Sequence, residues 1–86
     1  MKVILSSHFQ GYTNQRAEVE ARGTSLRALM ADLDKQFPGI RFRLVDEQDR
    51  IRPHVCAFVN GERTETLSTR LKASDEVHLL GSLSGG

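Results

Sequence analysis

The sequence has a single cysteine, Cys56, so no disulfide can form within the chain. The scarcity of cysteine agrees with a reducing compartment, and we expect a cytoplasmic protein. Cys56 lies in a short apolar run over residues 55–59. Because burial raises the pKa of a thiol, we predict that Cys56 packs in the core and is unreactive.

Neither sign of charge dominates, and long apolar runs are missing. The 12 basic and 11 acidic residues leave a formal net charge of +1. Nucleic-acid-binding proteins usually carry a basic surface, so we expect no nucleic-acid partner. The longest purely apolar run, residues 55–59, is far too short to span a membrane. Residues 2–5 are also too short for the core of a signal peptide, so we expect no membrane partner.

Groupings typical of metal sites and enzyme active sites are lacking too. The histidines His8, His54 and His78 are far apart, and no pair has the i, i+4 spacing of a zinc-binding helix. The sequence has no glycine-rich phosphate loop and no Gly-x-Ser-x-Gly motif. We therefore predict no metal, no stably bound cofactor and no catalytic residues in the chain itself. An enzyme built around Cys56 or the histidines is the alternative.

The chain does contain two strand-like segments near its start. Residues 2–8 begin with an apolar run, and residues 16–22 alternate apolar with charged side chains. Turn-forming residues at 10–14 separate them. This pattern predicts an antiparallel hairpin with one face toward water.

A helix is predicted over residues 26–37. Its apolar side chains recur at helical spacing: Leu26, Leu29, Met30, Leu33 and Phe37. Thr24 or Ser25 can cap its start, while Pro38 and Gly39 end it within two residues of Phe37. The apolar stripe indicates a helix that packs on the sheet.

Residues 40–53 have no regular pattern, and we expect a short turn or helical turn followed by a loop. The segment contains four arginines and three acidic residues: Arg41, Arg43, Arg50 and Arg52 with Asp46, Glu47 and Asp49. Because the acidic side chains nearly neutralise the arginines, we predict a solvated, salt-bridged face rather than a docking patch.

Three further strands are predicted over residues 54–59, 62–64 and 77–80. Asn60 and Gly61 favour a type I′ hairpin, because both central residues of that turn need positive φ. Leu67 and Leu71 anchor the connection to the last strand. The order of elements predicts an α+β fold in which a mixed sheet of four to five strands packs against one main helix.

The last strand leads without a linker into residues 81–86, which end in Gly85 and Gly86. We divide the chain into a domain over residues 1–80 and a flexible tail over residues 81–86. Glycine has no β-carbon, so this ending can pass through a narrow active-site opening. Six extended residues reach roughly 20 Å. The ending favours a terminal carboxylate that is the reactive group and on which a partner protein acts; the alternative is a frayed terminus without a function.

Several segments, taken in order, resemble one known family. They are residues 24–29 (TSLRAL), 37–40 (FPGI), 52–55 (RPHV), 58–62 (FVNGE) and 75–80 (DEVHLL), followed by Gly85 and Gly86. Over nearly its whole length the chain resembles the ubiquitin-like sulfur carriers of the MoaD/ThiS type. The resemblance implies their fold, the ubiquitin-like β-grasp.

The resemblance also implies where the chemistry takes place. In this family, an ATP-using adenylyltransferase related to ubiquitin-activating enzymes adenylates the terminal glycine, which becomes a thiocarboxylate. That reaction would fall on Gly86. A sulfur-accepting synthase would then make cysteine, thiamine, molybdopterin or a similar product. Gly85 would let the last peptide approach both active sites, with Ser82, Leu83 and Ser84 as an extended arm.

Two features of the tail leave alternatives open. Many members of the family have proline directly after the last strand, and Gly81 at that place predicts a more mobile exit for the tail. Leu83 either fills a pocket on the partner or folds back on its own domain. For the whole chain, the alternative function is a ubiquitin-like protein modifier joined through Gly86 to lysines of target proteins.

Overall fold

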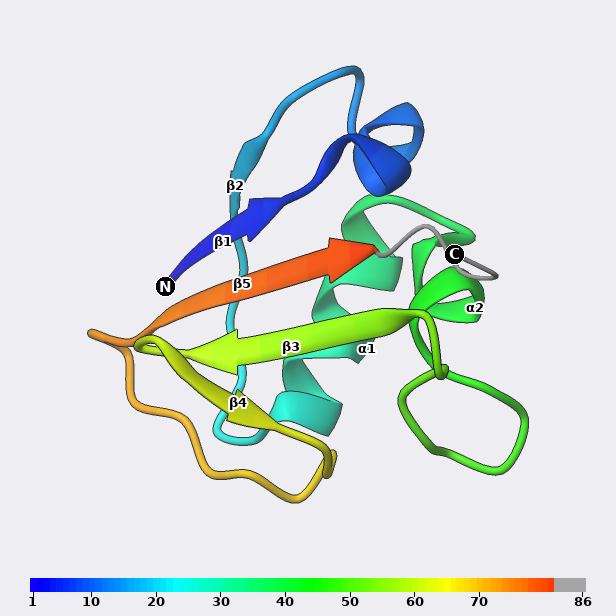
Figure 1. Cartoon of the computed structure of the whole chain (residues 1–86). Helices are drawn as coiled ribbons and strands as arrows, with labels where there is room; N and C mark the ends of the chain where they lie inside the picture. Colours follow the sequence, from blue (N-terminus) through cyan, green and yellow to red (C-terminus); the bar gives the residue numbers. More distant parts are fainter. Residues whose placement is uncertain (82–86) are drawn as a thin grey trace.

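The fold is a mixed five-stranded sheet with one long helix against one face (Figure 1). The computed structural model describes residues 1–81. The elements are β1 (Lys2–Leu5), the 3₁₀ helix η1 (Ser7–Tyr12), β2 (Glu18–Glu20), α1 (Leu26–Gln36), α2 (Ile40–Leu44), β3 (Val55–Val59), β4 (Glu62–Thr64) and β5 (Glu76–Gly81). The strand order is β2-β1-β5-β3-β4, with β1 parallel to β5 and the other neighbours antiparallel. The predicted α+β fold with a mixed sheet is confirmed.

The face of the sheet that meets α1 is apolar. Alternate residues of the central strands are buried there: Val3, Leu5, Val55, Ala57, Val77 and Leu79. Buried residues of α1 complete the core: Leu26, Leu29, Met30 and Leu33. The core therefore forms where a strand pattern of period two meets a helix pattern of period 3.6.

Helix α1 begins and ends where its capping residues predict. The side chain of Ser25 accepts a hydrogen bond from the backbone N–H of Ala28 at 3.2 Å, which satisfies one free donor of the first turn. Phe37 follows the helix as its C-cap, and Gly39 takes a φ of +99° before α2 begins. The predicted helix is confirmed to within one residue. Among residues 1–81, no helix is long and apolar enough to cross a membrane.

The first hairpin exists, but its strands are shorter than predicted. Strands β1 and β2 pair antiparallel, with Val3 opposite Val19. The predicted strand over residues 2–8 is wrong after Leu5, because the chain coils there into η1. This coil begins with a hydrogen bond from the N–H of Phe9 to the carbonyl of Ser6 at 3.0 Å, and it places Phe9 in the core at 1% exposure. Strand β1 therefore ends at Leu5, and the coil that follows it buries Phe9.

The second hairpin and the connection after it follow the sequence pattern. Asn60 and Gly61 have φ values of +51° and +86°, as a type I′ turn requires. They join β3 to β4, with Val59 opposite Glu62. Leu67 and Leu71 are both buried, which confirms that they anchor the chain between β4 and β5.

Cys56 lies on the other face of the sheet. Its neighbours Val55 and Ala57 point into the core, so the alternation of β3 leaves Cys56 half-buried opposite Leu80 of β5. The prediction that Cys56 packs in the core is therefore wrong.

Candidate functional site

The end of β5 is the candidate site, because it is the place from which the chain continues toward Gly86. Gly81 belongs to β5, so the strand extends one residue beyond the predicted boundary at residue 80. On one side it pairs with Val55 of β3. On the other side its N–H donates a hydrogen bond to the hydroxyl of Ser6 at 2.9 Å. Gly81 is thus paired on one side and hydrogen-bonded on the other, while the more mobile exit predicted for the tail stays a prediction.

Position 81 also requires glycine for a steric reason. A Cβ built at this position would lie 2.7 Å from Cγ of His8, 2.9 Å from its Cβ and 3.0 Å from its Nδ1. The side chain of His8 thus takes the place that any side chain at position 81 would need. Nδ1 of His8 lies 3.4 Å from the hydroxyl of Ser6, so both residues border the same strand end.

This arrangement could not be expected from the sequence alone. Ser6 and Gly81 are 75 positions apart, and no local motif links them. We name Ser6, His8 and Gly81 together the exit cluster. The predicted tail residues beyond it, Ser82, Leu83, Ser84, Gly85 and Gly86, lie outside the described residues.

Comparisons with known proteins identify the family of this chain. The model of the ThiS family matches residues 3–86. The chain belongs to the ThiS family. None of the curated proteins matches it.

Solved structures similar to this ThiS-family protein include CysO of Mycobacterium tuberculosis, with 26% identity and a TM-score of 0.89 over 95% of this chain and 98% of that one. A chain of the BexX/CysO complex of Amycolatopsis orientalis has 25% identity and a TM-score of 0.90, over 99% of this chain and 98% of that one. The small archaeal modifier protein 1 of Methanosarcina acetivorans shares the fold at 23% identity and a TM-score of 0.82, covering 99% and 94%. The predicted ubiquitin-like β-grasp fold is thereby confirmed. Members of this family are small carrier proteins rather than enzymes.

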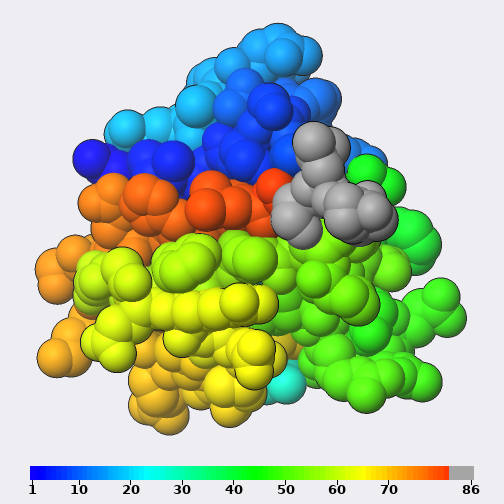
Figure 2. Space-filling model, in the orientation of Figure 1, coloured from blue at the N-terminus to red at the C-terminus, as the bar shows by residue number. Residues whose placement is uncertain are grey.

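The open face of the sheet in this ThiS-family protein carries a row of half-buried side chains across its central strands. Ile4, His78 and Phe58 lie opposite one another on β1, β5 and β3. Figure 2 shows this face, with β5 between β1 and β3. Nε2 of His78 lies 3.1 Å from Oε1 of Glu76 on the same strand.

The histidines are not brought together. His8 lies on η1, His54 precedes β3 and His78 lies on β5. Among residues 1–81, no three His, Cys, Asp or Glu side chains are placed to hold one metal ion. In residues 1–81 of this ThiS-family protein, Ser6 and His8 therefore meet at the end of β5, and the histidines do not form a common site.

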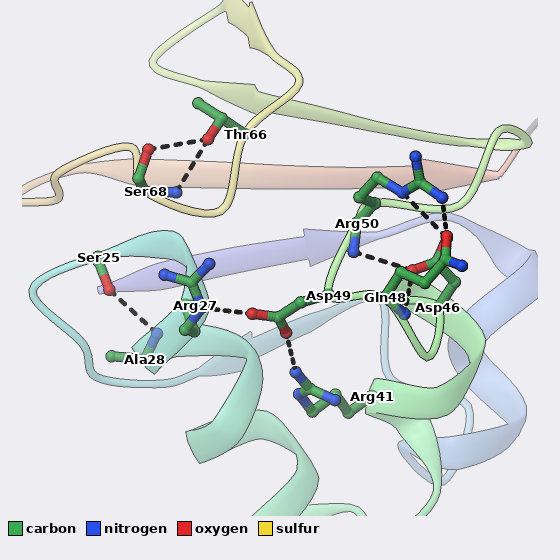
Figure 3. A network of polar contacts seen from close by, with 10 residues as sticks. All are labelled: Ser25, Arg27, Ala28, Arg41, Asp46, Gln48, Asp49, Arg50, Thr66 and Ser68. Atoms are coloured by element: carbon green, nitrogen blue, oxygen red, sulfur yellow. Dashed lines mark hydrogen bonds and ion pairs between the residues drawn. The ribbon is translucent and has the colours of Figure 1, made fainter.

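The arginine-rich segment forms a network that links α1, α2 and the following loop (Figure 3). Asp49 accepts hydrogen bonds from Nε of Arg27 at 2.8 Å and from Nη2 of Arg41 at 2.6 Å. The hydrogen bond from Arg27 is the main cause that lowers the pKa of Asp49, with Arg41 acting in the same direction. Asp46 pairs with Arg50 at 3.8 Å. The predicted salt-bridged face is confirmed for these residues.

Proposed function

We propose that this protein is a sulfur carrier and that the α-carboxylate of Gly86 is its reactive group. An ATP-using adenylyltransferase related to ubiquitin-activating enzymes activates Gly86, and the resulting thiocarboxylate donates its sulfur to a synthase. The synthase builds a sulfur-containing metabolite or cofactor, such as cysteine, thiamine or molybdopterin. ATP is bound by the partner, and the carrier itself works in the cytoplasm.

The proposal follows from the low reactivity of a carboxylate. The pKa of a terminal carboxyl is about 3.3–3.7, so at neutral pH the group is an anion and a poor electrophile. In the first step a carboxylate oxygen attacks the α-phosphate of ATP and pyrophosphate leaves. In the second step hydrogen sulfide ion attacks the carbonyl carbon, AMP leaves and the thioacid loses its proton. The product is a sulfur nucleophile on the carrier.

The observation that carries the proposal is the family match, which runs through residue 86 and thus includes both terminal glycines. The fixed position of Gly81 supports it, because a tail can be presented reproducibly only if the strand before it is held in place. The similar chain from Amycolatopsis orientalis forms a complex with BexX, which supports a function that needs a partner protein.

The alternative is a protein modifier joined by an isopeptide bond between Gly86 and lysines of target proteins. The fold shared with small archaeal modifier protein 1 keeps this alternative open. Both functions need the same activation of Gly86, and they differ only in the nucleophile that attacks next. A Gly-Gly remnant on lysines of other proteins, found by mass spectrometry of digested cell extract, would support the modifier.

The activation step is tested with the adenylyltransferase encoded nearest to the gene of this protein. The enzyme, ATP and the wild-type chain should release pyrophosphate, and a variant that lacks Gly86 should not. A Cys56→Ser variant is the matched control, because the proposed chemistry does not use the thiol. Equal release with and without Gly86 contradicts the proposal, and loss of activity only in Cys56→Ser would favour an enzyme built around Cys56.

A further inference from the structure

Phe42 on α2 is an exposed aromatic side chain that is held in a fixed position. It is 63% exposed, the largest value among the exposed large apolar residues of the described chain. The guanidinium of Arg52 lies 4.8 Å from the centroid of its ring, and Nε of Arg52 donates a hydrogen bond to the carbonyl of Phe42 at 2.7 Å. A ring fixed in this way loses little conformational freedom when another protein covers it.

Two exposed or half-buried arginines differ from the others in the segment: Arg43, which follows Phe42 in α2, and Arg52, which lies against its ring. Arg41 and Arg50 form ion pairs with aspartates. Neither Arg43 nor Arg52 forms an ion pair with a carboxylate of residues 1–81. The predicted salt-bridged face therefore includes only two of the four arginines of the segment, Arg41 and Arg50. The other two belong to what we name the Phe42 patch, which consists of Phe42, Arg43 and Arg52.

The Phe42 patch lies at the end of the sheet where β5 ends. The N–H of Val55 donates a hydrogen bond to the carbonyl of Arg52 at 2.9 Å, and Val55 pairs with Gly81. In Figure 1, α2 and the end of β5 both lie toward the right-hand end of the domain. The patch and the exit cluster therefore belong to the same end of the domain.

The length of the tail decides which surface a partner must meet. Five residues from Gly81 to Gly86 span at most about 18 Å, even when extended. The domain measures 33 × 26 × 24 Å, so an enzyme that encloses Gly86 has to approach the end that bears Gly81. The same approach brings it to Phe42, Arg43 and Arg52.

We infer that the Phe42 patch is the docking surface for the enzyme that activates Gly86. That enzyme supplies an apolar pocket for the ring of Phe42, bordered by aspartate or glutamate side chains that pair with Arg43 and Arg52. Aromatic residues and arginine are the side chains that most often dominate binding at interfaces, and opposite charges orient the approach. The inference rests on the proposed function, since it takes the partner to be the adenylyltransferase.

Steady-state kinetics of the adenylyltransferase test the inference. Pyrophosphate release is measured at rising concentrations of the wild-type chain and of the variants Phe42→Ala and Arg43→Glu. We expect KM to rise about ten- to thirtyfold for each variant, because a central contact is lost or a charge is reversed. The value of kcat should stay near that of the wild type, since the patch does not touch the reacting atoms. Urea unfolding of both variants checks that the fold is kept.

Lys72→Glu is the matched control for the charge reversal. Lys72 is exposed and lies before β5, at the opposite end of that strand from Gly81. The Lys72→Glu variant should leave KM unchanged. An unchanged KM in Phe42→Ala and Arg43→Glu, together with turnover that needs Gly86, contradicts the docking surface alone. Failure of the wild-type chain to support turnover that needs Gly86 contradicts the proposed function, and the docking surface falls with it.

Discussion

Replacing Gly81 by alanine should destabilise the domain, because His8 occupies the place of the new side chain. The added Cβ would lie 2.7 Å from Cγ and 2.9 Å from Cβ of His8. Rotation of the His8 side chain about its Cα–Cβ bond moves Cγ and Nδ1 away, but Cβ stays in place because it is attached to the backbone of η1. Overpacking costs about 1–3 kcal/mol, and a weakened hydrogen bond between Gly81 and Ser6 costs about 0.5–1.5 kcal/mol more.

We therefore expect the free energy of unfolding to fall by about 2 kcal/mol, with a decrease in Tm of about 4–8 °C for each kcal/mol. Urea unfolding of the wild type and of Gly81→Ala measures this. The control is Gly11→Ala, because a Cβ at Gly11 meets nothing within 4 Å. This control should change the stability by less than about 0.5 kcal/mol.

A double-mutant cycle with His8→Ala shows whether the clash is the cause. His8→Ala removes Cγ and Nδ1 of the ring, so Gly81→Ala should cost about 1 kcal/mol less in that background. The reasoning is refuted if Gly81→Ala costs the same in both backgrounds, or if it is as harmless as Gly11→Ala.

Three further predictions concern the helix, the core and the charged network. Ser25→Ala removes the cap of α1 and should lower the free energy of unfolding by about 1 kcal/mol in urea titrations. Leu33→Ala empties a fully buried site and should cost about 2–5 kcal/mol in the same assay; a smaller loss would mean that the core is not packed there as described. The pKa of Asp49 lies below its usual value of 3.8, so its stabilising effect is present above that value and is lost as the pH falls through the lowered pKa. Asp49→Asn should therefore reduce the loss of stability between neutral pH and about pH 3, and an unchanged pH profile of the urea midpoint would contradict this.

Local signals in the sequence predicted most of the elements. The cap at Ser25, the glycine at position 39 and the turn at Asn60 and Gly61 act through their immediate neighbours, so they could be recognised without tertiary information. The first strand was predicted too long, because nothing in the neighbouring sequence indicates that Phe9 turns into the core. Boundaries of this kind are set by packing and not by propensity.

The site could be predicted only in part. The glycine ending and the resemblance to sulfur carriers pointed to Gly86. The exit cluster depends on a contact between Ser6 and Gly81, which only the folded sheet brings together. The same holds for the arginines: their number was evident, but the ion pair of Arg41 and the lack of one for Arg43 depend on where Asp49 lies in the fold.

The mass of the intact carrier is the most direct test of the central claim, which is that Gly86 carries sulfur. The protein is incubated with its adenylyltransferase, ATP and sulfide, and then measured by mass spectrometry. The account predicts a gain equal to the difference between a sulfur and an oxygen atom, located on Gly86 by fragmentation and absent when ATP is left out. A carrier whose mass stays unchanged, although the enzyme adenylates Gly86, would contradict the account.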